Sequence, residues 1–240
     1  MPHSLRAAAI GAALAAAATL AACTPADVVK SAPEAAAGPM VSATAALQEL
    51  DRLPVKGRAP QTGYSRDQFG PAWSDSGTAS GSHGGCSTRN EILARDLTDI
   101  VRQGPCTVVS GVLHDPYTAR TISFTRGVKT SLAVQIDHVV PLSLSWQTGA
   151  QQLSAAERLS LARDPLNLVA VDGPTNGAKG DGDAATWLPP NKPIRCGYAQ
   201  RQIEVKVKYK LWVTPPEKEA LRRVLGSCPG PALPGEGASK

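Results

Sequence analysis

The sequence predicts an α+β fold, because segments with helical periodicity and segments with strand periodicity both occur along the chain. Apolar side chains recur at helical spacing over 91–101, and they alternate with period two over 108–113 and 119–124. Hydrophobic residues make up 42 % of the 240 positions, which excludes disorder throughout the chain. The 22 Gly and 20 Pro add the expectation of many loops or extended ends.

The first half of the chain carries three further local signals. Residues 40–53 are compatible with a short helix, and 91–101 predict a second helix, with charged residues between the apolar positions. The two alternating segments flank a turn centred on Asp115-Pro116, which is typical of a β-hairpin.

The second half predicts two more strands and a final helix. Residues 132–136 form a strand that runs into Asp137-His138, and 166–171 form another, followed by a turn and a short helix that begins at Thr175 or Asn176. Residues 203–213 alternate with period two, which favours a strand, although their spacing also allows a helix. The segment after Thr214, a candidate cap, predicts a helix that begins with Pro215.

The N-terminus has the organisation of an export signal: a basic start, an apolar Ala-rich stretch, and small residues before Cys23. That ending resembles a bacterial lipobox, in which the cysteine is lipidated, and the alternative is an ordinary signal site with a coincidental Cys. We therefore expect a lipoprotein signal peptide over 1–22, a flexible Ala/Pro-rich tether over 23–60, one folded domain over 61–228 and a disordered tail over 229–240. The expected location is the outer cell surface, with membrane contact only through the lipid anchor.

Lipidation of Cys23 leaves an even number of four cysteines for an oxidising compartment. We predict the two local disulfides, Cys86–Cys106 and Cys196–Cys228, over the other pairings. The competing interpretation is a structural zinc site, which the absence of any C-x-x-C spacing disfavours.

Charge gives one further indication. The formal net charge is +5, and 195–210 contains five basic side chains and one acid. A basic stripe of this kind suits a polyanion. The alternative is a single solvated face of a surface element.

Polar residues of catalytic type gather in three short motifs. Asp137-His138 ends a predicted strand and precedes an apolar run that ends in Pro, Asn167 heads the next strand, and the following helix start bears Asn176 and Lys179. Each motif alone is common. Together they place an acid, a base, two amides and a cation at neighbouring strand and helix ends.

With these motifs the sequence resembles the HNH endonuclease superfamily, and most closely the secreted actinobacterial HNH proteins of the DUF1524 type, which are related to the nuclease domain of GmrSD-like restriction systems. The resemblance extends over most of the predicted domain. It is carried by Cys86-Ser87-Thr88-Arg89, Leu93-Ala94-Arg95-Asp96-Leu97, Asp115-Pro116-Tyr117-Thr118, the motif from Asp137 to Pro141, Asp164-Pro165-Leu166-Asn167-Leu168, the motif from Asn176 to Asp181, and Trp187-Leu188-Pro189-Pro190.

The resemblance implies a ββα-metal core, in which two strands and a helix hold one divalent cation, with added helices, a β-hairpin and disulfides in place of zinc. It assigns His138 as the general base that takes a proton from water. Asp137 and Asn176 become the metal ligands, with Mg²⁺ as the first expectation and Mn²⁺ as an alternative. Asn167 braces the loop and orients the histidine, and Lys179 is placed to neutralise a phosphate oxygen.

Several nearby residues have two interpretations each. Arg89 and Arg95 either line the cleft and bind phosphate or take part in buried ion pairs. Asp181 and Asp183 either join the metal shell or cap the helix and face solvent. The further candidates for substrate contact are Lys206 and Lys208, and Trp146 and Trp187 are expected in the core, with base stacking as the alternative.

The function that follows is a metal-dependent endonuclease that hydrolyses phosphodiester bonds, with DNA favoured over RNA. The sequence contains no recognisable base-reading module, so we expect weak sequence preference. No obligate protein partner is inferred. The alternative is a non-catalytic envelope lipoprotein that binds a polyanion or a cell-wall partner through the same fold.

Overall fold

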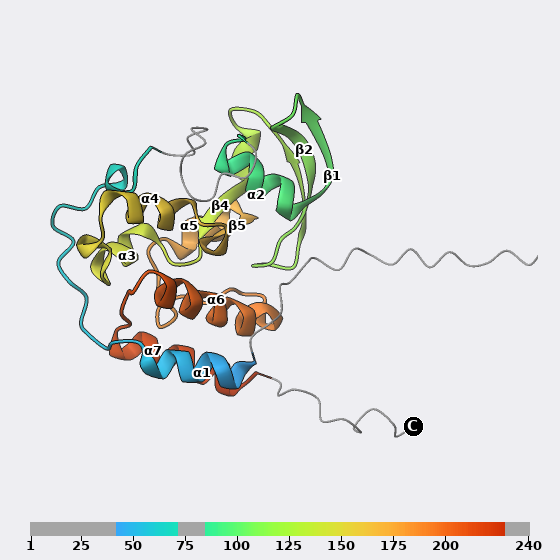
Figure 1. The fold of residues 1–240 in the computed structure, drawn as a ribbon. Helices are drawn as coiled ribbons and strands as arrows, with labels where there is room; N and C mark the ends of the chain where they lie inside the picture. The colour runs from blue at the N-terminus through green and yellow to red at the C-terminus, as the bar shows by residue number, and fades with distance from the viewer. Residues whose placement is uncertain (1–41, 72–84, 229–240) are drawn as a thin grey trace, which may run out of the picture. The chain divides into compact units, whose positions relative to one another are not determined.

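The computed structural model describes residues 42–71 and 85–228. The predicted signal over 1–22, the lipidation site Cys23 and the predicted tail over 229–240 lie outside these residues. Within the described part, helices and strands form a mixed α+β fold held by two disulfides, as the sequence predicts (Figure 1).

A three-stranded antiparallel sheet occupies the first half of the described chain, in the order β1-β2-β3. It confirms the predicted hairpin, because the alternating segments form its two later strands. The helix α2 packs against it and buries Leu93 completely. The elements are α2 (Thr88–Asp96), β1 (Leu97–Gln103), β2 (Thr107–His114) and β3 (Thr121–Thr125).

The prediction of one helix over 91–101 is wrong in its second half. The helix ends at Asp96, and Val101 lies instead in β1, where it pairs with Ser110 of β2. An irregularity in the ladder before Val101 includes Asp99, which has a left-handed φ of 49°. Pairing with β2 satisfies the backbone of this segment, and this tertiary contact outweighs the helical spacing of its apolar residues.

A second, two-stranded sheet carries the candidate residues Asp137 and His138. The strands β4 (Val134–His138) and β5 (Leu168–Asp172) run antiparallel, and α5 (Gly173–Lys179) follows directly and contacts both. The helix begins earlier than expected, because the Asp172 side chain accepts a hydrogen bond from the Thr175 amide at 2.9 Å and so caps it. This early start places α5 against the strand pair (Figure 1).

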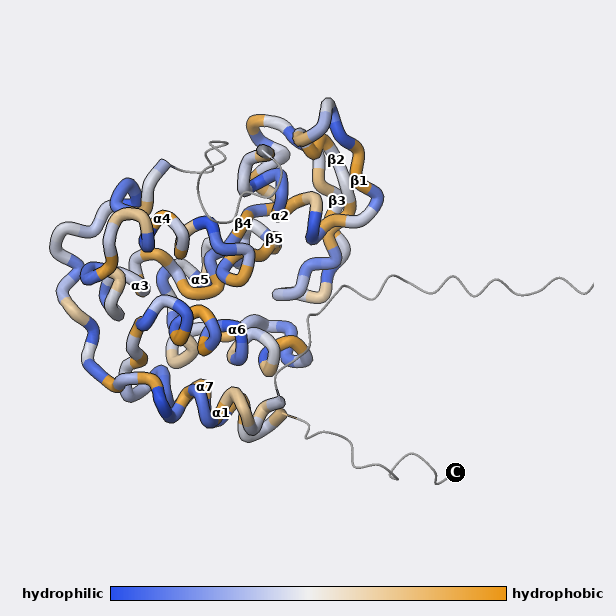
Figure 2. Tube along the Cα trace, in the orientation of Figure 1, coloured by the Kyte–Doolittle hydropathy of each residue, from blue (hydrophilic) through white to orange (hydrophobic). Residues whose placement is uncertain are grey.

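Helices surround this strand pair. Two short ones follow β4 in sequence, α3 (Leu142–Gln147) and α4 (Ala155–Arg163), and a capping box fixes the start of α4. Three others pack on one another: α1 (Ala43–Arg52), α6 (Arg195–Lys208) and α7 (Pro215–Gly226). Hydrophilic and hydrophobic residues alternate along α6 and α7 (Figure 2). Short 3-10 turns complete the chain: η1 (Arg66–Phe69), η2 (Thr130–Ala133), η3 (Ala150–Gln152), η4 (Pro165–Asn167) and η5 (Lys192–Ile194).

The final helices give one correction and one confirmation. The preferred strand over 203–213 is wrong, since α6 is helical to Lys208, and the alternative helical spacing was the correct interpretation. Ile203 is fully buried there while Val207 is 41 % exposed, so these two apolar residues lie on different faces of the helix. The predicted helix after Thr214 is confirmed, and Thr214 forms its capping box with Glu217.

The segment over 42–60 belongs to the folded unit, so the expected domain start at residue 61 is placed too late. Leu50 of α1 is fully buried against α6 and α7. Further along, Val55 forms an isolated parallel bridge with Val213, and the Trp212 indole donates a hydrogen bond to the Gly57 carbonyl at 3.0 Å. Only a few apolar residues make these contacts, so the overall Ala/Pro-rich composition of the segment predicted a tether.

Both predicted disulfides are confirmed. Cys86–Cys106 joins the start of α2 to the turn between β1 and β2, and Cys196–Cys228 joins the start of α6 to the end of α7. This pairing rules out a zinc site built from these four cysteines. No helix in the described part of the chain is both long and apolar enough to cross a membrane.

Candidate active site

The candidate site lies at the end of β4, where Asp137 and His138 follow one another. Successive side chains of a strand point to opposite faces, so the two residues meet different neighbours. Asp137 contacts Lys179 of α5 and Tyr117, whereas His138 contacts α4. The two side chains therefore have different hydrogen-bond partners, although both border one hollow at this strand end.

Asp137 is held by two partners. The Lys179 ammonium lies 2.8 Å from each of its carboxylate oxygens, and the Tyr117 hydroxyl donates to Oδ2 at 2.5 Å. Burial raises the pKa of the Asp137 carboxyl above its usual value, although Lys179 and Tyr117 both favour the ionised form. The contacts of Tyr117 were not foreseen from the sequence, where the residue is only part of a matching motif.

The expected phosphate contact of Lys179 is wrong for this structure. Its side chain is fully buried, and its ammonium also donates to the His138 carbonyl at 2.7 Å. Lys179 therefore ties α5 to the end of β4 and does not face a substrate.

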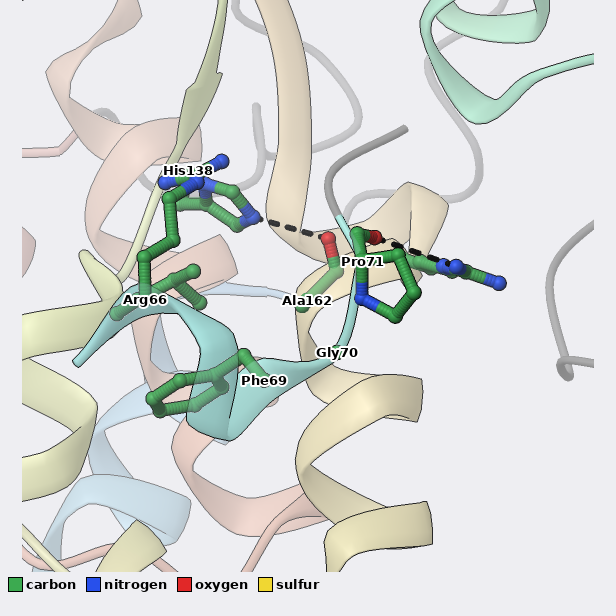
Figure 3. Close-up of a pocket in the computed structure, with 8 residues that line it drawn as sticks. Arg66, Phe69, Gly70, Pro71, His138 and Ala162 are labelled. Atoms are coloured by element: carbon green, nitrogen blue, oxygen red, sulfur yellow. Dashed lines mark hydrogen bonds between the residues drawn. The ribbon is translucent and has the colours of Figure 1, made fainter. Parts of the chain in front are cut away.

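His138 is fixed by a backbone carbonyl of α4. Its Nε2 lies 2.9 Å from the Ala162 oxygen, as Figure 3 shows. A carbonyl only accepts, so Nε2 carries the proton and Nδ1 is the basic nitrogen. Burial lowers the pKa of His138 to about 3, with smaller contributions from the charges of Arg66 and Lys179. The imidazole is therefore neutral at neutral pH.

Asn167 braces the loop that follows His138. Its Oδ1 accepts a hydrogen bond from the Val140 amide at 2.8 Å, and its Nδ2 donates to the Val140 carbonyl at 3.2 Å. Its backbone carbonyl accepts from the Val139 amide at 2.8 Å, and the side chain is fully buried. These contacts match the bracing position that the sequence suggests.

Asn176 and Asp137 line the same hollow. This hollow has a volume of about 220 Å³ and is also lined by His138, Asp181 and Arg66. The Asn176 amide nitrogen donates to Gln135 at 2.9 Å, which leaves the carbonyl oxygen of the amide for another ligand. Across residues 42–71 and 85–228, no three His, Cys, Asp or Glu side chains cluster as a metal site, so any cation here depends on the Asn oxygen as well.

The two additional acids, Asp181 and Asp183, differ in their exposure and contacts. Asp181 is exposed and lines the hollow. Asp183 is buried, accepts hydrogen bonds from the backbone amides of Ala185 and Thr186, and pairs with Arg58 at 2.8 Å. Asp183 therefore has the capping role that was the alternative to metal binding.

The two upstream arginines stabilise the scaffold. Arg89 donates to the Val134 carbonyl at 3.1 Å, beside the start of β4. Arg95 pairs with Asp96 at 2.6 Å and donates to the Leu168 carbonyl at the start of β5. Neither lines the hollows beside His138, so these contacts favour the structural interpretation of both residues.

The basic residues of 195–210 do not form one continuous exposed stripe. Lys206 is fully buried and pairs with Glu217 at 3.0 Å, and Lys208 pairs with Asp164 at 2.6 Å. Arg201 donates to three backbone carbonyls of the 165–168 segment. The predicted substrate contact of Lys206 is wrong, because its side chain is buried in the ion pair with Glu217. The Lys208 side chain is 53 % exposed, so its substrate contact stays a prediction.

The two tryptophans belong to the core, as expected. Trp146 is 8 % exposed and lies in the apolar cluster with Phe69 and Leu144. Trp187 packs edge-on against Tyr117, with ring centroids 5.1 Å apart. Trp187 therefore supports the tyrosine that holds Asp137.

A comparison with protein families identifies one that matches more than half of the chain. The family described as GmrSD restriction endonucleases, C-terminal domain, matches residues 87–224. The chain belongs to this family. The GmrSD match covers Asp137, His138, Asn167, Asn176 and Lys179, so the whole motif set lies inside a nuclease-family domain.

A curated relative extends the similarity beyond the GmrSD match. It is an "Uncharacterized secreted protein" of Arthroderma benhamiae, 40 % identical over 189 residues, which are 78 % of this chain and 86 % of the relative. No solved structure matches the chain.

Proposed function

We propose that this protein is a metal-dependent endonuclease that hydrolyses phosphodiester bonds of nucleic acid. The observation that carries the proposal is the hollow at the end of β4, where His138, Asp137 and Asn176 meet within a GmrSD-type domain. A neutral imidazole beside a carboxylate and an amide oxygen is a donor set suited to hydrolysis at a phosphate.

In this proposal His138 is the general base. Its Nε2–H bond to the Ala162 carbonyl fixes the ring and leaves Nδ1 as the basic nitrogen. Nδ1 takes a proton from the attacking water, and general-base catalysis of this kind contributes about 10²- to 10⁴-fold to a rate. Asn167 keeps the following loop in place and has no direct part in the chemistry.

The residues fit one divalent cation by their chemistry. Asp137 and Asn176 supply hard oxygen donors to the same hollow, and Asp181 lines it too. The Asp137 oxygens already accept from Lys179 and Tyr117, so a cation would use the lone pairs that these contacts leave. Such ligands suit Mg²⁺, or Mn²⁺ as an alternative, and leave further coordination positions for phosphate and water. When bound, the cation would stabilise the charge on the phosphate and the leaving oxygen. In this proposal β4, β5 and α5 form the two strands and the helix of a ββα-metal core of the HNH type.

The proposed substrate is DNA rather than RNA, cut with weak sequence preference. The formal charge of +5 favours any polyanion, and the expectation of low specificity rests on the lack of a base-reading module. No obligate protein partner is proposed.

The competing function is a non-catalytic envelope protein that binds a polyanion or cell-wall partner through the same fold. A binding protein has no need of an imidazole that a backbone carbonyl holds in a fixed orientation beside a carboxylate and an amide. The arrangement of His138 therefore favours the enzyme.

The two functions differ in one assay. Purified protein is incubated with supercoiled plasmid, linear duplex, single-stranded DNA and RNA, with Mg²⁺ or Mn²⁺ and with EDTA as the control. The enzyme predicts nicking that requires the cation and stops in EDTA. Binding of these nucleic acids with no cleavage under any condition would favour the non-catalytic alternative.

We also propose that the protein is exported and anchored by lipid on Cys23. The curated relative carries the description of a secreted protein, which supports export. The two disulfides suit an oxidising compartment. The lipid anchor rests on the lipobox-like sequence alone.

A further inference from the structure

Arg66 lines both hollows beside His138, as does the apolar Leu142. The larger one, described above, and a smaller one next to Phe69 and Ala162 are both lined by Arg66 and His138. Figure 3 shows the Arg66 side chain extending from η1 towards His138. Arg66 precedes the family match, which begins at residue 87, so it is not part of the GmrSD motif set.

The turn that carries Arg66 is fixed on α4. Phe69 at the end of η1 is 1 % exposed, and Arg158 of α4 donates to the Gln68 carbonyl at 2.8 Å. Gly70 ends the turn with a φ of 81°, and a Cβ at this position would lie 2.5 Å from the Leu159 side chain. The same helix, α4, supplies the Ala162 carbonyl that fixes His138. Contacts with α4 therefore position both Arg66 and His138.

The segment before η1 is fixed as well. Gln61 donates to the Ser143 hydroxyl at 2.8 Å, and the Trp146 indole donates to the Thr62 carbonyl at 3.3 Å. These contacts come from α3, which follows β4 in sequence. Residues 61–70 are therefore a preformed wall of the site.

Charge then identifies the role of this wall. Lys179, the cation expected at the phosphate, is fully buried and neutralises Asp137. Among the described residues that line the larger hollow, Arg66 supplies the positive charge, and it is exposed. A guanidinium presents two parallel N–H donors that match a phosphate, and it stays charged at all relevant pH values.

We propose that Arg66 binds the scissile phosphate beside His138, so that 61–70 completes the active site of the family domain. This inference rests on the proposed function. It assigns to Arg66 the phosphate contact that the sequence suggested for Lys179.

The first arm of the test measures cleavage by the full chain and three variants. Arg66→Ala should lower kcat/KM for plasmid cleavage by about 10²- to 10³-fold, the usual loss when one preorganised donor to a developing charge is removed. Arg66→Lys should lie between this variant and the wild type, because it keeps the charge without the bidentate geometry. Arg52→Ala removes the same charge from the last turn of α1, outside both hollows, and should leave the rate unchanged.

The second arm measures binding without turnover. The probe is a phosphorothioate DNA duplex in EDTA, titrated at several salt concentrations. Arg66→Ala should weaken binding and reduce the slope of log K against log salt by about one, since one phosphate contact is lost. Arg52→Ala should keep the wild-type slope.

The outcomes separate this inference from the proposed function. Wild-type cleavage that Arg66→Ala retains in full would overturn the role of Arg66 and leave the endonuclease standing. Absence of cleavage by the wild type would contradict the endonuclease, and the binding arm would still decide on Arg66: an unchanged salt slope overturns it. An activity loss that accompanies a lowered melting temperature in Arg66→Ala, but not in Arg52→Ala, would assign Arg66 to the scaffold and also overturn the proposal.

Discussion

The Lys179 ammonium lies 2.8 Å from both carboxylate oxygens of Asp137, and the two side chains are 0 % and 6 % exposed. This ion pair connects α5 to the end of β4, the two elements that contribute the candidate metal ligands. The negative charge of Asp137 is thus balanced by the protein itself. We therefore expect the pair to keep the site assembled in the metal-free protein.

Removal of Lys179 should destabilise the fold strongly. Lys179→Ala leaves a buried carboxylate without its cation, and breaking a buried pair in this way costs about 3–5 kcal/mol. The free energy of unfolding, measured by urea denaturation in EDTA, should fall by this amount. The exposed Lys129→Ala provides the control for the loss of one lysine charge.

A double-mutant cycle distinguishes the pair from general packing. Asp137→Ala in the Lys179→Ala background should cost less than Asp137→Ala alone, because the cation it serves is already gone. Additive losses in unfolding free energy would contradict the coupling.

Acid should destabilise the protein through His138. The unfolded histidine has a pKa of 6.5 and the folded one a pKa of about 3, so between these values the unfolded chain binds a proton that the native state does not. The contribution of the neutral His138 to the free energy of unfolding is complete above pH 6.5. It is lost as the pH falls towards 3, at up to about 1.4 kcal/mol per pH unit. Urea denaturation in EDTA at several pH values measures it. In His138→Asn the free energy of unfolding should depend less on pH between 6.5 and 3. If it falls with pH as steeply as in the wild type, His138 is not a buried neutral imidazole.

The segment over 42–60 should be needed for full stability. A chain that begins at residue 61 lacks Leu50 and Leu53, whose burial contributes about 1.5–3 kcal/mol each. It should melt at a lower temperature than a chain that begins at residue 42, as measured by circular dichroism. A chain that begins at residue 23 is the control for length and should match the chain from residue 42. Equal melting of all three would mean that α1 adds nothing to the fold.

Export should end in lipidation of Cys23. Cys23→Ser should move the protein from the membrane fraction to the culture medium or block its processing, because the lipid is the proposed anchor. Fractionation and mass spectrometry of the mature N-terminus test this. Wild-type protein found only in the medium, with an N-terminus other than Cys23, would disprove the anchor.

Local signals in the sequence predict much of the site. Asp137, His138, Asn167 and Asn176 lie in short motifs at strand and helix ends, and the structure brings Asp137, His138 and Asn176 to one hollow. Their places at strand and helix ends follow from local patterns, whereas their grouping in one site and their roles are implied by the resemblance to the HNH family. The Cys86–Cys106 and Cys196–Cys228 disulfides also follow from local patterns, because each closes a local loop.

Long-range contacts account for what the sequence could not predict. Lys206 and Lys179 are buried ion-pair partners, whereas charge in a sequence indicates exposure by default. Val101 lies in a strand because β2 pairs with it, and no local property distinguishes it from a helical residue. Arg66 lies 72 positions before His138. It enters the site through contacts of η1 with α4 that carry no local motif.

The most direct test of the account is the cleavage rate of His138→Ala relative to the wild type, measured on plasmid DNA at saturating Mg²⁺ or Mn²⁺. If Nδ1 of His138 takes the proton from water, the rate should fall by about 10²- to 10⁴-fold. Cation binding, followed by calorimetry, should survive, because the imidazole is not a proposed ligand, whereas Asp137→Ala should lose both. Cleavage by His138→Ala at the wild-type rate would contradict the assignment of the base and with it the central claim.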